Sequence, residues 1–214
     1  MLPLDQSLRS IDNSEIVKIK PFINFNIFKD SYPLKTDVLL IPPVINPFFE
    51  GNKNNFLPLG ILSLASNLRK EGFSVQIYQP KHRLLNKQDY HKVAKDILQF
   101  NPGIIGFSTW CITYPASLLI AEQLKLENQQ TQIVFGGPQA SILATETLNN
   151  FSFVDFVLAG EADYSFPQFI KEIINKTRDF SKINGLSFRN EQAEITSNKL
   201  AHFIKNLDEL PIPA

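Results

Sequence analysis

The chain has 214 residues, enough for one substantial hydrophobic core with an appendage. Its 21 basic and 21 acidic side chains balance, so no broad basic field of the kind that binds nucleic acid is present. Cys111 is the only cysteine, which excludes an internal disulfide and any multi-cysteine metal or iron–sulfur site within these residues.

The N-terminus lacks a basic region followed by a continuous apolar run, so it does not read as a signal peptide. No later apolar run approaches the roughly 18–20 residues that a bilayer requires. We therefore expect a cytoplasmic protein with no membrane partner.

Residues 1–36 form an extension in which phenylalanines lie among asparagines and lysines, and prolines interrupt any long element. The domain proper begins with an apolar strand at 37–41, which ends at Pro42-Pro43 because proline cannot continue a central ladder. A loop at 44–57 leads to a helix at 58–72, which starts with proline and ends with glycine.

The same alternation then repeats along the chain. We expect strands at 73–78, 104–108, 131–137 and 154–158, and helices at 90–100, 114–127 and 138–148, with a last helix that follows Gly160-Glu161 and runs to about Asn175. Strands that alternate with helices predict a parallel sheet covered on both faces. Five such units indicate a flavodoxin-like, Rossmann-like, doubly wound α/β domain whose ligands bind beyond the carboxyl ends of the strands.

The end of the chain departs from this rhythm. Residues 183–196 read as a β-hairpin with a polar turn at 189–192, and 206–214 is extended and punctuated by prolines. The expected organisation is an N-terminal extension, an α/β domain, a hairpin region and a linker, at 1–36, 37–180, 181–205 and 206–214.

Four loops should meet at the carboxyl edge of this sheet. They contribute Pro42, Pro43, Leu59, Gly60, Ser108, Thr109, Trp110, Gly136, Gly137, Pro138, Gln139, Gly160 and Glu161. Any one loop needs prolines and glycines for its turn alone. Their joint occurrence favours a ligand site, because glycines let a ligand approach the main chain and small polar groups can bind it.

Two ligand classes are excluded by the residues after the strands. A dinucleotide site needs G-x-G-x-x-G after the first strand, where this chain has Ile41-Pro42-Pro43-Val44. A phosphorylated receiver domain needs acidic residues there and an aspartate after the third strand, where this chain has Ser108-Thr109.

Several motifs, taken in their order and spacing, resemble one family. They are Val38-Leu-Leu-Ile-Pro-Pro43, Leu57-Pro-Leu-Gly60, Gly106-Phe-Ser-Thr109, Gly136-Gly-Pro-Gln-Ala-Ser141, Gly160-Glu161, Asn184-Gly-Leu-Ser-Phe-Arg189 and Leu207-Asp-Glu-Leu-Pro-Ile-Pro213. Together they resemble the cobalamin (vitamin B12)-binding domain that precedes the catalytic barrel in cobalamin-dependent radical S-adenosylmethionine enzymes. The resemblance covers about residues 37–214.

The resemblance implies a corrin ring over the strand ends and a nucleotide tail between the sheet and its helices. Ser108, Thr109, Gly136 and Gly137 match the positions beside that tail, where hydroxyls would donate hydrogen bonds. Replacement of Gly137 by valine is then expected to abolish corrinoid retention while leaving the fold intact. The loop from Pro43 to Leu59 would lie beneath the ring.

The family pattern is incomplete at the metal-facing side. Other cobalamin modules carry D-x-H-x-x-G after the first strand, whereas this loop has no histidine, and we expect surface roles for His82, His91 and His202. Cobalamin is therefore expected to bind base-off, without a protein imidazole. Gln139 stands where relatives often have histidine and cannot titrate near neutrality.

Two further side chains near the strand ends have alternative roles. Cys111 has no basic neighbour in sequence and is expected to be an inert thiol. Glu161 is expected either to favour a helix N-terminus as a carboxylate or to contact a ligand.

No residue is assigned a catalytic or metal-ligating role. The C-x-x-x-C-x-x-C motif that holds the cluster of radical S-adenosylmethionine enzymes is absent from this sequence, so the chain alone is not expected to be catalytic. The cluster and S-adenosylmethionine would belong to a barrel in cis, if the chain is a fragment, or in trans, if it is a free-standing carrier. The alternative is a docking or structural module that has lost cobalamin binding.

Overall fold

The structure, a computed structural model, describes residues 36–44, 58–80, 84, 86–200 and 203–214. These residues belong to one compact unit, Pro33–Ala214. The extension expected at 1–36 and most of the loop after the first strand fall outside the described residues, as do His82 and His202.

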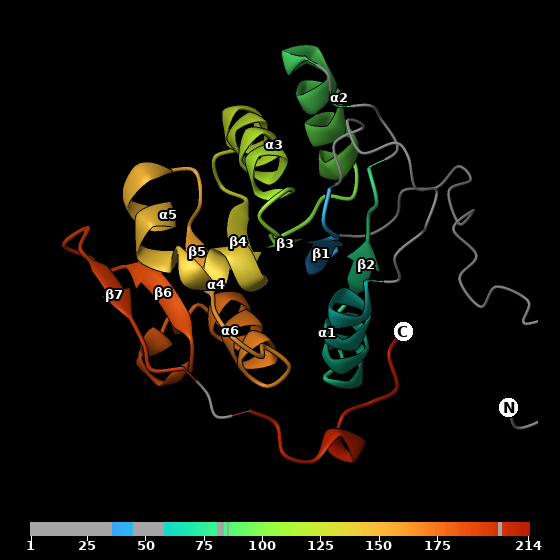
Figure 1. The fold of residues 1–214 in the computed structure, drawn as a ribbon, viewed down its shortest axis with the longest axis vertical. Coiled ribbons are helices and arrows are strands. Elements are labelled where there is room, and N and C mark those ends of the chain that lie inside the picture. Colours follow the sequence, from blue (N-terminus) through green and yellow to red (C-terminus); the bar gives the residue numbers. More distant parts are fainter. Residues whose placement is uncertain (1–35, 45–57, 81–83, 85, 201–202) are drawn as a thin grey trace, which may run out of the picture. The chain divides into compact units, whose positions relative to one another are not determined.

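A seven-stranded sheet forms the centre of this unit, with strand order β2-β1-β3-β4-β5-β6-β7 (Figure 1). The strands are β1 (Val38–Ile41), β2 (Val75–Ile77), β3 (Ile104–Ser108), β4 (Gln132–Gly136), β5 (Phe156–Leu158), β6 (Leu186–Arg189) and β7 (Ile195–Ser197). The first five pair in parallel, whereas β6 and β7 pair antiparallel. The expected doubly wound fold is confirmed, and the predicted hairpin extends the sheet beyond β5.

Helices cover both faces of the sheet. They are α1 (Leu59–Lys70), α2 (Lys87–Leu98), α3 (Tyr114–Glu127), α4 (Pro138–Ile142), α5 (Ala144–Asn150) and α6 (Ser165–Ile174). α1 and α6 lie on one side, and α2, α3 and α5 lie on the other (Figure 1). Two separate apolar clusters result, one on each face, because successive strand residues point to opposite sides.

Two helices differ from the sequence-based expectation. α2 begins at Lys87 rather than Tyr90, because the Asn86 side chain accepts hydrogen bonds from the backbone N–H groups of Gln88 and Asp89 and forms a capping box. The single helix expected at 138–148 is two helices, which meet at Leu143.

The face beneath α1 and α6 changes character along β3. Ile104 belongs to the buried cluster on this face, and by alternation Gly106 and Ser108 point to the same side. On β4, Val134 and Gly136 do the same. Bulky residues thus give way to small ones toward the carboxyl ends of the two central strands.

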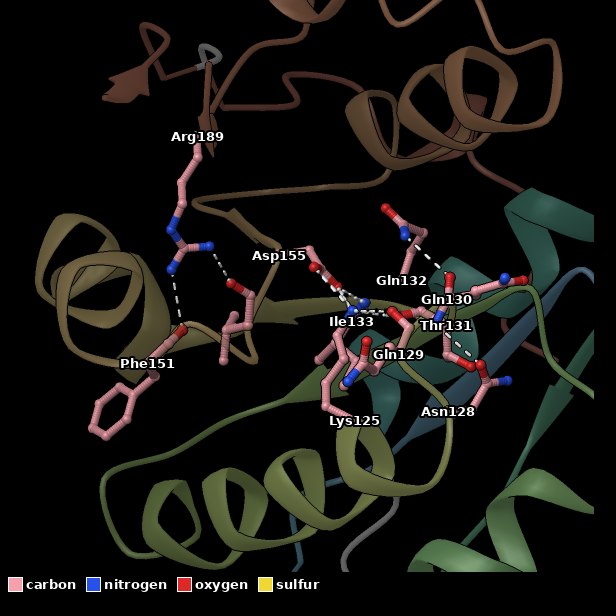
Figure 2. Close-up of polar contacts among 11 residues, drawn as sticks. Lys125, Asn128, Gln129, Gln130, Thr131, Gln132, Ile133, Phe151, Asp155 and Arg189 are labelled. Atoms are coloured by element: carbon pink, nitrogen blue, oxygen red, sulfur yellow. Dashed lines mark hydrogen bonds and ion pairs between the residues drawn. The ribbon is translucent and has the colours of Figure 1, made fainter. Parts of the chain in front are cut away.

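A polar network joins the β6–β7 hairpin to the end of α5 and links Lys125 to the amino ends of β4 and β5 (Figure 2). The Arg189 guanidinium on β6 donates to three backbone carbonyls near the end of α5, those of Leu148, Phe151 and Val154. Of these three acceptors, Figure 2 labels Phe151. Lys125 of α3 lies 2.8 Å from the Asp155 carboxylate, which also accepts from the Ile133 N–H. Side chains of the domain itself therefore occupy the edge of the sheet at the amino ends of these strands.

The C-terminal segment contacts α1 and Glu161, which precedes α6. The Ile204 N–H donates to the Glu161 carboxylate (2.7 Å), the Ser66 hydroxyl donates to the Ile212 carbonyl, and the Ala214 N–H donates to the Leu62 carbonyl. The segment expected to be a linker thus lies against the domain. Among the described helices, none is long and apolar enough to cross a bilayer.

Candidate functional site

The sheet places four loops at one edge. β1 lies between β2 and β3, so the chain passes to one side of β1 to form β2 and then to the other side to form β3. Because β1, β3, β4 and β5 are parallel, the loops that follow them all emerge at the carboxyl edge of the sheet. The register pairs Ile41 with Phe107, Ser108 with Gly136, and Gly136 with Leu158. The residues predicted to converge are therefore brought to one edge.

The loops after β3 and β4 are joined through Thr109. Its N–H and its hydroxyl both donate to the Gly136 carbonyl, at 2.8 and 2.9 Å. The hydroxyl also accepts from the Ala140 N–H at 3.2 Å, and the residue has no exposed surface. The hydroxyl expected to bind a ligand is instead committed to holding the two loops together.

Gly137 has a similar internal role. Its φ is +88°, and an added Cβ would lie 2.7 Å from the carbonyl oxygen and 2.8 Å from the nitrogen of Thr109. A side chain there would collide with main chain rather than enter an open channel. The expectation that Gly137→Val leaves the fold intact is therefore wrong.

Gly136, one residue earlier, is less crowded, and an added Cβ there would make ordinary van der Waals contacts. A Cβ added there would meet only two backbone oxygens, those of Leu158 at 3.4 Å and Phe107 at 3.9 Å, and no described side chain within 4 Å. Ser108 beside it is half-buried, and no hydrogen bond to its hydroxyl is formed within the described part of the chain. We use the word cradle for the part of the sheet surface at Gly136 and Ser108, where no described side chain lies within 4 Å of a Cβ added at Gly136.

The cradle ends two residues deeper. At Gly106 an added Cβ would lie 3.0 Å from Leu40 Cδ2 and 3.4 Å from Phe166 Cζ. Both side chains are buried, and Phe166 lies in the first turn of α6. These side chains close the cradle from below.

Hydrogen bonds join α1 to the segment before α6. The Ser63 hydroxyl donates to Asp163 Oδ1 at 2.5 Å, and the Asn67 amide donates to the Asp163 carbonyl at 2.6 Å. Ser165, the first residue of α6, is 4% exposed, yet its hydroxyl has no hydrogen-bond partner among the described residues. An unpaired buried hydroxyl is costly, which makes it a candidate ligand group.

Large apolar side chains surround the strand ends. Leu59 is 59% exposed at the start of α1, and Trp110 is 41% exposed in the loop after β3. Ile112, Ile142 and Tyr164, which follow β3, β4 and β5, are exposed as well. An added Cβ at Gly60 would meet nothing within 4 Å. All five of these apolar side chains follow a parallel strand in the chain, and the carboxyl edge of such strands is where doubly wound domains bind ligands.

The remaining predicted residues have backbone or surface roles. Pro42 is buried directly after β1 and Pro43 is half-buried, whereas Pro138 is exposed at the start of α4 and Gln139 is half-buried. The Gly160 N–H donates to the Ser141 hydroxyl at 3.1 Å. Cys111 is exposed after Trp110.

Two of the titratable side chains named above, Glu161 and His91, have partners within the domain. The Glu161 carboxylate accepts a hydrogen bond from the Ile204 N–H and precedes the first turn of α6, so the helix N-terminal role expected for it is not seen, and its contact with a ligand stays a prediction. His91 lies on α2, 3.5 Å from Glu127, with part of its side chain exposed.

A separate polar cavity of about 200 Å³ lies between α1 and α6. Its lining includes the Glu71–Lys171 ion pair (2.7 Å) and Glu209 of the C-terminal segment. Its polar, largely exposed lining lacks the glycine cradle, so we do not assign it to the site at the strand ends.

The sequence reasoning missed the contributions of Gly106, Phe166 and Ser165. A glycine inside a strand signals close approach by another group, and this signal was available at Gly106. The partners that fill its space come from β1 and α6 and become visible only in the folded chain.

The fold is a doubly wound α/β domain, and its cradle lies at the carboxyl ends of β3 and β4, one strand away from the switch point between β1 and β3. The B12 binding domain family model matches residues 53–170, more than half of the chain. The chain belongs to this family.

Longer proteins contain similar segments. An uncharacterized methyltransferase of Pyrococcus horikoshii is 27% identical over 177 residues, which cover 83% of this chain and 37% of that protein. The cobalamin-dependent S-adenosylmethionine radical enzyme OxsB, with aqua-cobalamin and S-adenosylmethionine bound, has a TM-score of 0.64 at 21% identity. The match covers 83% of this chain and 24% of OxsB, and the aqua-cobalamin form alone gives 0.62 at 22% identity with the same coverage. The chain thus spans well under half the length of these proteins.

Proposed function

We propose that the chain binds a cobalamin-type corrinoid at the carboxyl edge of its sheet. The observation that carries this proposal is that no described side chain lies within 4 Å of a Cβ added at Gly136, in a chain that belongs to the B12 binding domain family. Among the described residues, no side chain covers Gly136 and none forms a hydrogen bond with the Ser108 hydroxyl, so the two suit the nucleotide tail. Leu59 and Trp110 suit the apolar face of the corrin ring.

The corrinoid is expected to bind base-off and without a protein imidazole. The loop between β1 and α1 has no histidine, and His91 lies on α2 beside Glu127. Electron paramagnetic resonance of the cob(II)alamin form should show no nitrogen hyperfine coupling from an axial ligand. A spectrum with one strongly coupled nitrogen would contradict this part of the proposal.

The chain's role is to position the cofactor, and bound cobalamin would supply methyl-transfer chemistry. The relatives are longer proteins, among them a methyltransferase and a radical S-adenosylmethionine enzyme. We place the chain as the cofactor-carrying domain of such an enzyme, with the barrel in cis or in trans, or as a free-standing carrier. Size and activity of the protein purified from its natural source would separate these arrangements.

A substitution pair tests the site. Gly136→Val places two methyl groups in the cradle and is expected to abolish retention of hydroxocobalamin after desalting. Gly103→Val is a matched control, because an added Cβ at Gly103 also meets one backbone oxygen at 3.4 Å, that of Asp37, at the amino end of β3. Circular dichroism and urea unfolding of both variants check that folding is retained.

The outcomes separate the proposal from its alternative. Retention by wild type and by Gly103→Val, with loss in folded Gly136→Val, supports the cradle as the site. Retention by folded Gly136→Val would place the cofactor elsewhere. A folded wild-type protein that retains no corrinoid would instead favour the docking or structural module. The exposed apolar side chains that follow the strands, such as Leu59 and Trp110, would then contact a protein.

A further inference from the structure

The cradle has a floor made by side chains. Gly106 has no side chain, and the space above it is filled by Leu40 Cδ2 from β1 and by Phe166 Cζ from α6. Leu40 is 1% exposed and Phe166 is 3% exposed. Over Gly136, by contrast, no described side chain lies within 4 Å of an added Cβ.

The depth of the cradle follows from the strand register. Ser108 ends β3 and pairs with Gly136, whereas Gly106 lies two residues deeper and pairs with Val134. At about 3.3 Å per residue, two residues of parallel strand give a depth of roughly 7 Å. The nucleotide tail of cobalamin joins a phosphate, a ribose and a bicyclic base in series, which together are longer than this depth.

The two floor residues are held differently. Leu40 lies within the ladder, where it pairs with Ile77 of β2 and Gly106 of β3. Phe166 is the second residue of α6 and stacks on Phe169 with ring centroids 6.2 Å apart. A rotamer change or a small shift of the first helical turn would move the Phe166 ring without breaking a strand pair.

We propose that Phe166 is a specificity-determining residue that sets how far a corrinoid tail enters the domain. Binding of a corrinoid with a complete nucleotide tail requires the Phe166 ring to leave the space above Gly106. Cobinamide has the same ring system without the nucleotide, so it makes no such demand. This inference rests on the proposed corrinoid-binding function and assigns to Phe166 the discrimination between tailed and tailless forms.

The experiment compares affinities for aquacobalamin and diaquacobinamide by absorbance titration in wild type, Phe166→Leu and Phe169→Leu. Leucine at 166 lacks the Cζ atom that reaches Gly106, so cobalamin affinity is expected to rise several-fold relative to cobinamide affinity. Phe169→Leu is the control for general loosening of α6, because it removes the buried ring on which Phe166 stacks but keeps the Phe166 ring, whose Cζ is the α6 atom nearest to an added Cβ at Gly106. Its affinity ratio should rise less than that of Phe166→Leu.

Each result decides a different point. An unchanged ratio in a folded Phe166→Leu, with both corrinoids bound by wild type, overturns this inference and leaves the proposed function standing. An equal rise in both variants also overturns it, because general loosening of α6 would then be responsible. Binding of neither corrinoid by folded wild type overturns the proposed function together with the inference.

Discussion

Gly137 lies directly against the backbone of Thr109, so closely that an added Cβ would stand 2.7 Å from the Thr109 carbonyl oxygen. The φ of +88° adds a second constraint, because side chains rarely adopt it. This contact and the hydrogen bonds of Thr109 to Gly136 fix the spacing of the loops after β3 and β4. The two glycines therefore have different roles. Gly137 allows the close backbone contact with Thr109, and Gly136 lies where no described side chain covers the sheet.

Gly137→Ala is expected to lower the free energy of unfolding by about 1–3 kcal/mol, through the strained φ and the forced movement of Thr109. Gly136→Ala should cost less than Gly137→Ala, since its Cβ meets only ordinary contacts. Urea unfolding of the two variants measures the difference. Equal stability of Gly137→Ala and wild type would show that the two loops are not held as described.

Ser165→Ala is expected to raise the free energy of unfolding by about 1 kcal/mol, because it removes a buried hydroxyl that has no hydrogen-bond partner among the described residues. The same substitution should weaken cobalamin binding if this hydroxyl serves the cofactor. Thr131→Val is the control, since Thr131 Oγ1 is also buried and unpaired but precedes β4 at the opposite edge. It should stabilise the protein without changing cobalamin affinity. Cobalamin affinity that is equal in both variants would exclude Ser165 from the site.

Much of the fold could be predicted because local signals were strong. β3 and α3 have the boundaries that the sequence indicated, since an apolar run follows Pro102-Gly103 and helix-forming residues follow Tyr114. The start of α2 was missed although Asn86 and Asp89 have capping-box spacing. The break between α4 and α5 at Leu143 was missed because no glycine or proline marks it. In α5, Thr147 forms a hydrogen bond with Tyr114 of α3, a long-range contact that local sequence cannot predict.

The site was less predictable than the fold. Sequence order identified the loops that meet, but it could not show which way each side chain points. The sequence predicted that the hydroxyls of Ser108 and Thr109 both donate hydrogen bonds to the nucleotide tail, whereas the fold buries Thr109 and leaves Ser108 beside the cradle. Phe166 became part of the site only because α6 folds back over Gly106.

Arg189→Lys is expected to lower the free energy of unfolding by about 2 kcal/mol, since a lysine cannot reproduce the planar fork that reaches the carbonyls of Leu148, Phe151 and Val154. Amide hydrogen exchange should also accelerate in β6 and β7. Arg178→Lys provides the control, because Arg178 is exposed and its side chain forms no such bonds within the described residues. If both variants unfold at the same urea concentration as wild type, the guanidinium does not anchor the hairpin.

Asp155 should make a pH-dependent contribution to stability. Burial raises the pKa of its carboxyl above the ordinary value of 3.8, although hydrogen bonds from Lys125 and from the Ile133 N–H, together with the positive charges of Lys125 and Arg189, oppose the shift. A raised pKa in the folded state means that the folded protein binds the proton more tightly than the unfolded chain does. The resulting stabilisation is complete below pH 3.8 and is lost as the pH rises through the folded-state pKa.

Asp155→Asn removes this titration while retaining an oxygen that can accept from the Ile133 N–H. The free energy of unfolding of wild type minus that of the variant should therefore fall as the pH rises from 3.8 through the folded-state pKa, and become constant above it. Urea unfolding of both proteins at a series of pH values gives this difference directly, because the other titrating groups are shared. A difference that rises with pH would mean that the ion pair with Lys125 outweighs burial of the carboxylate.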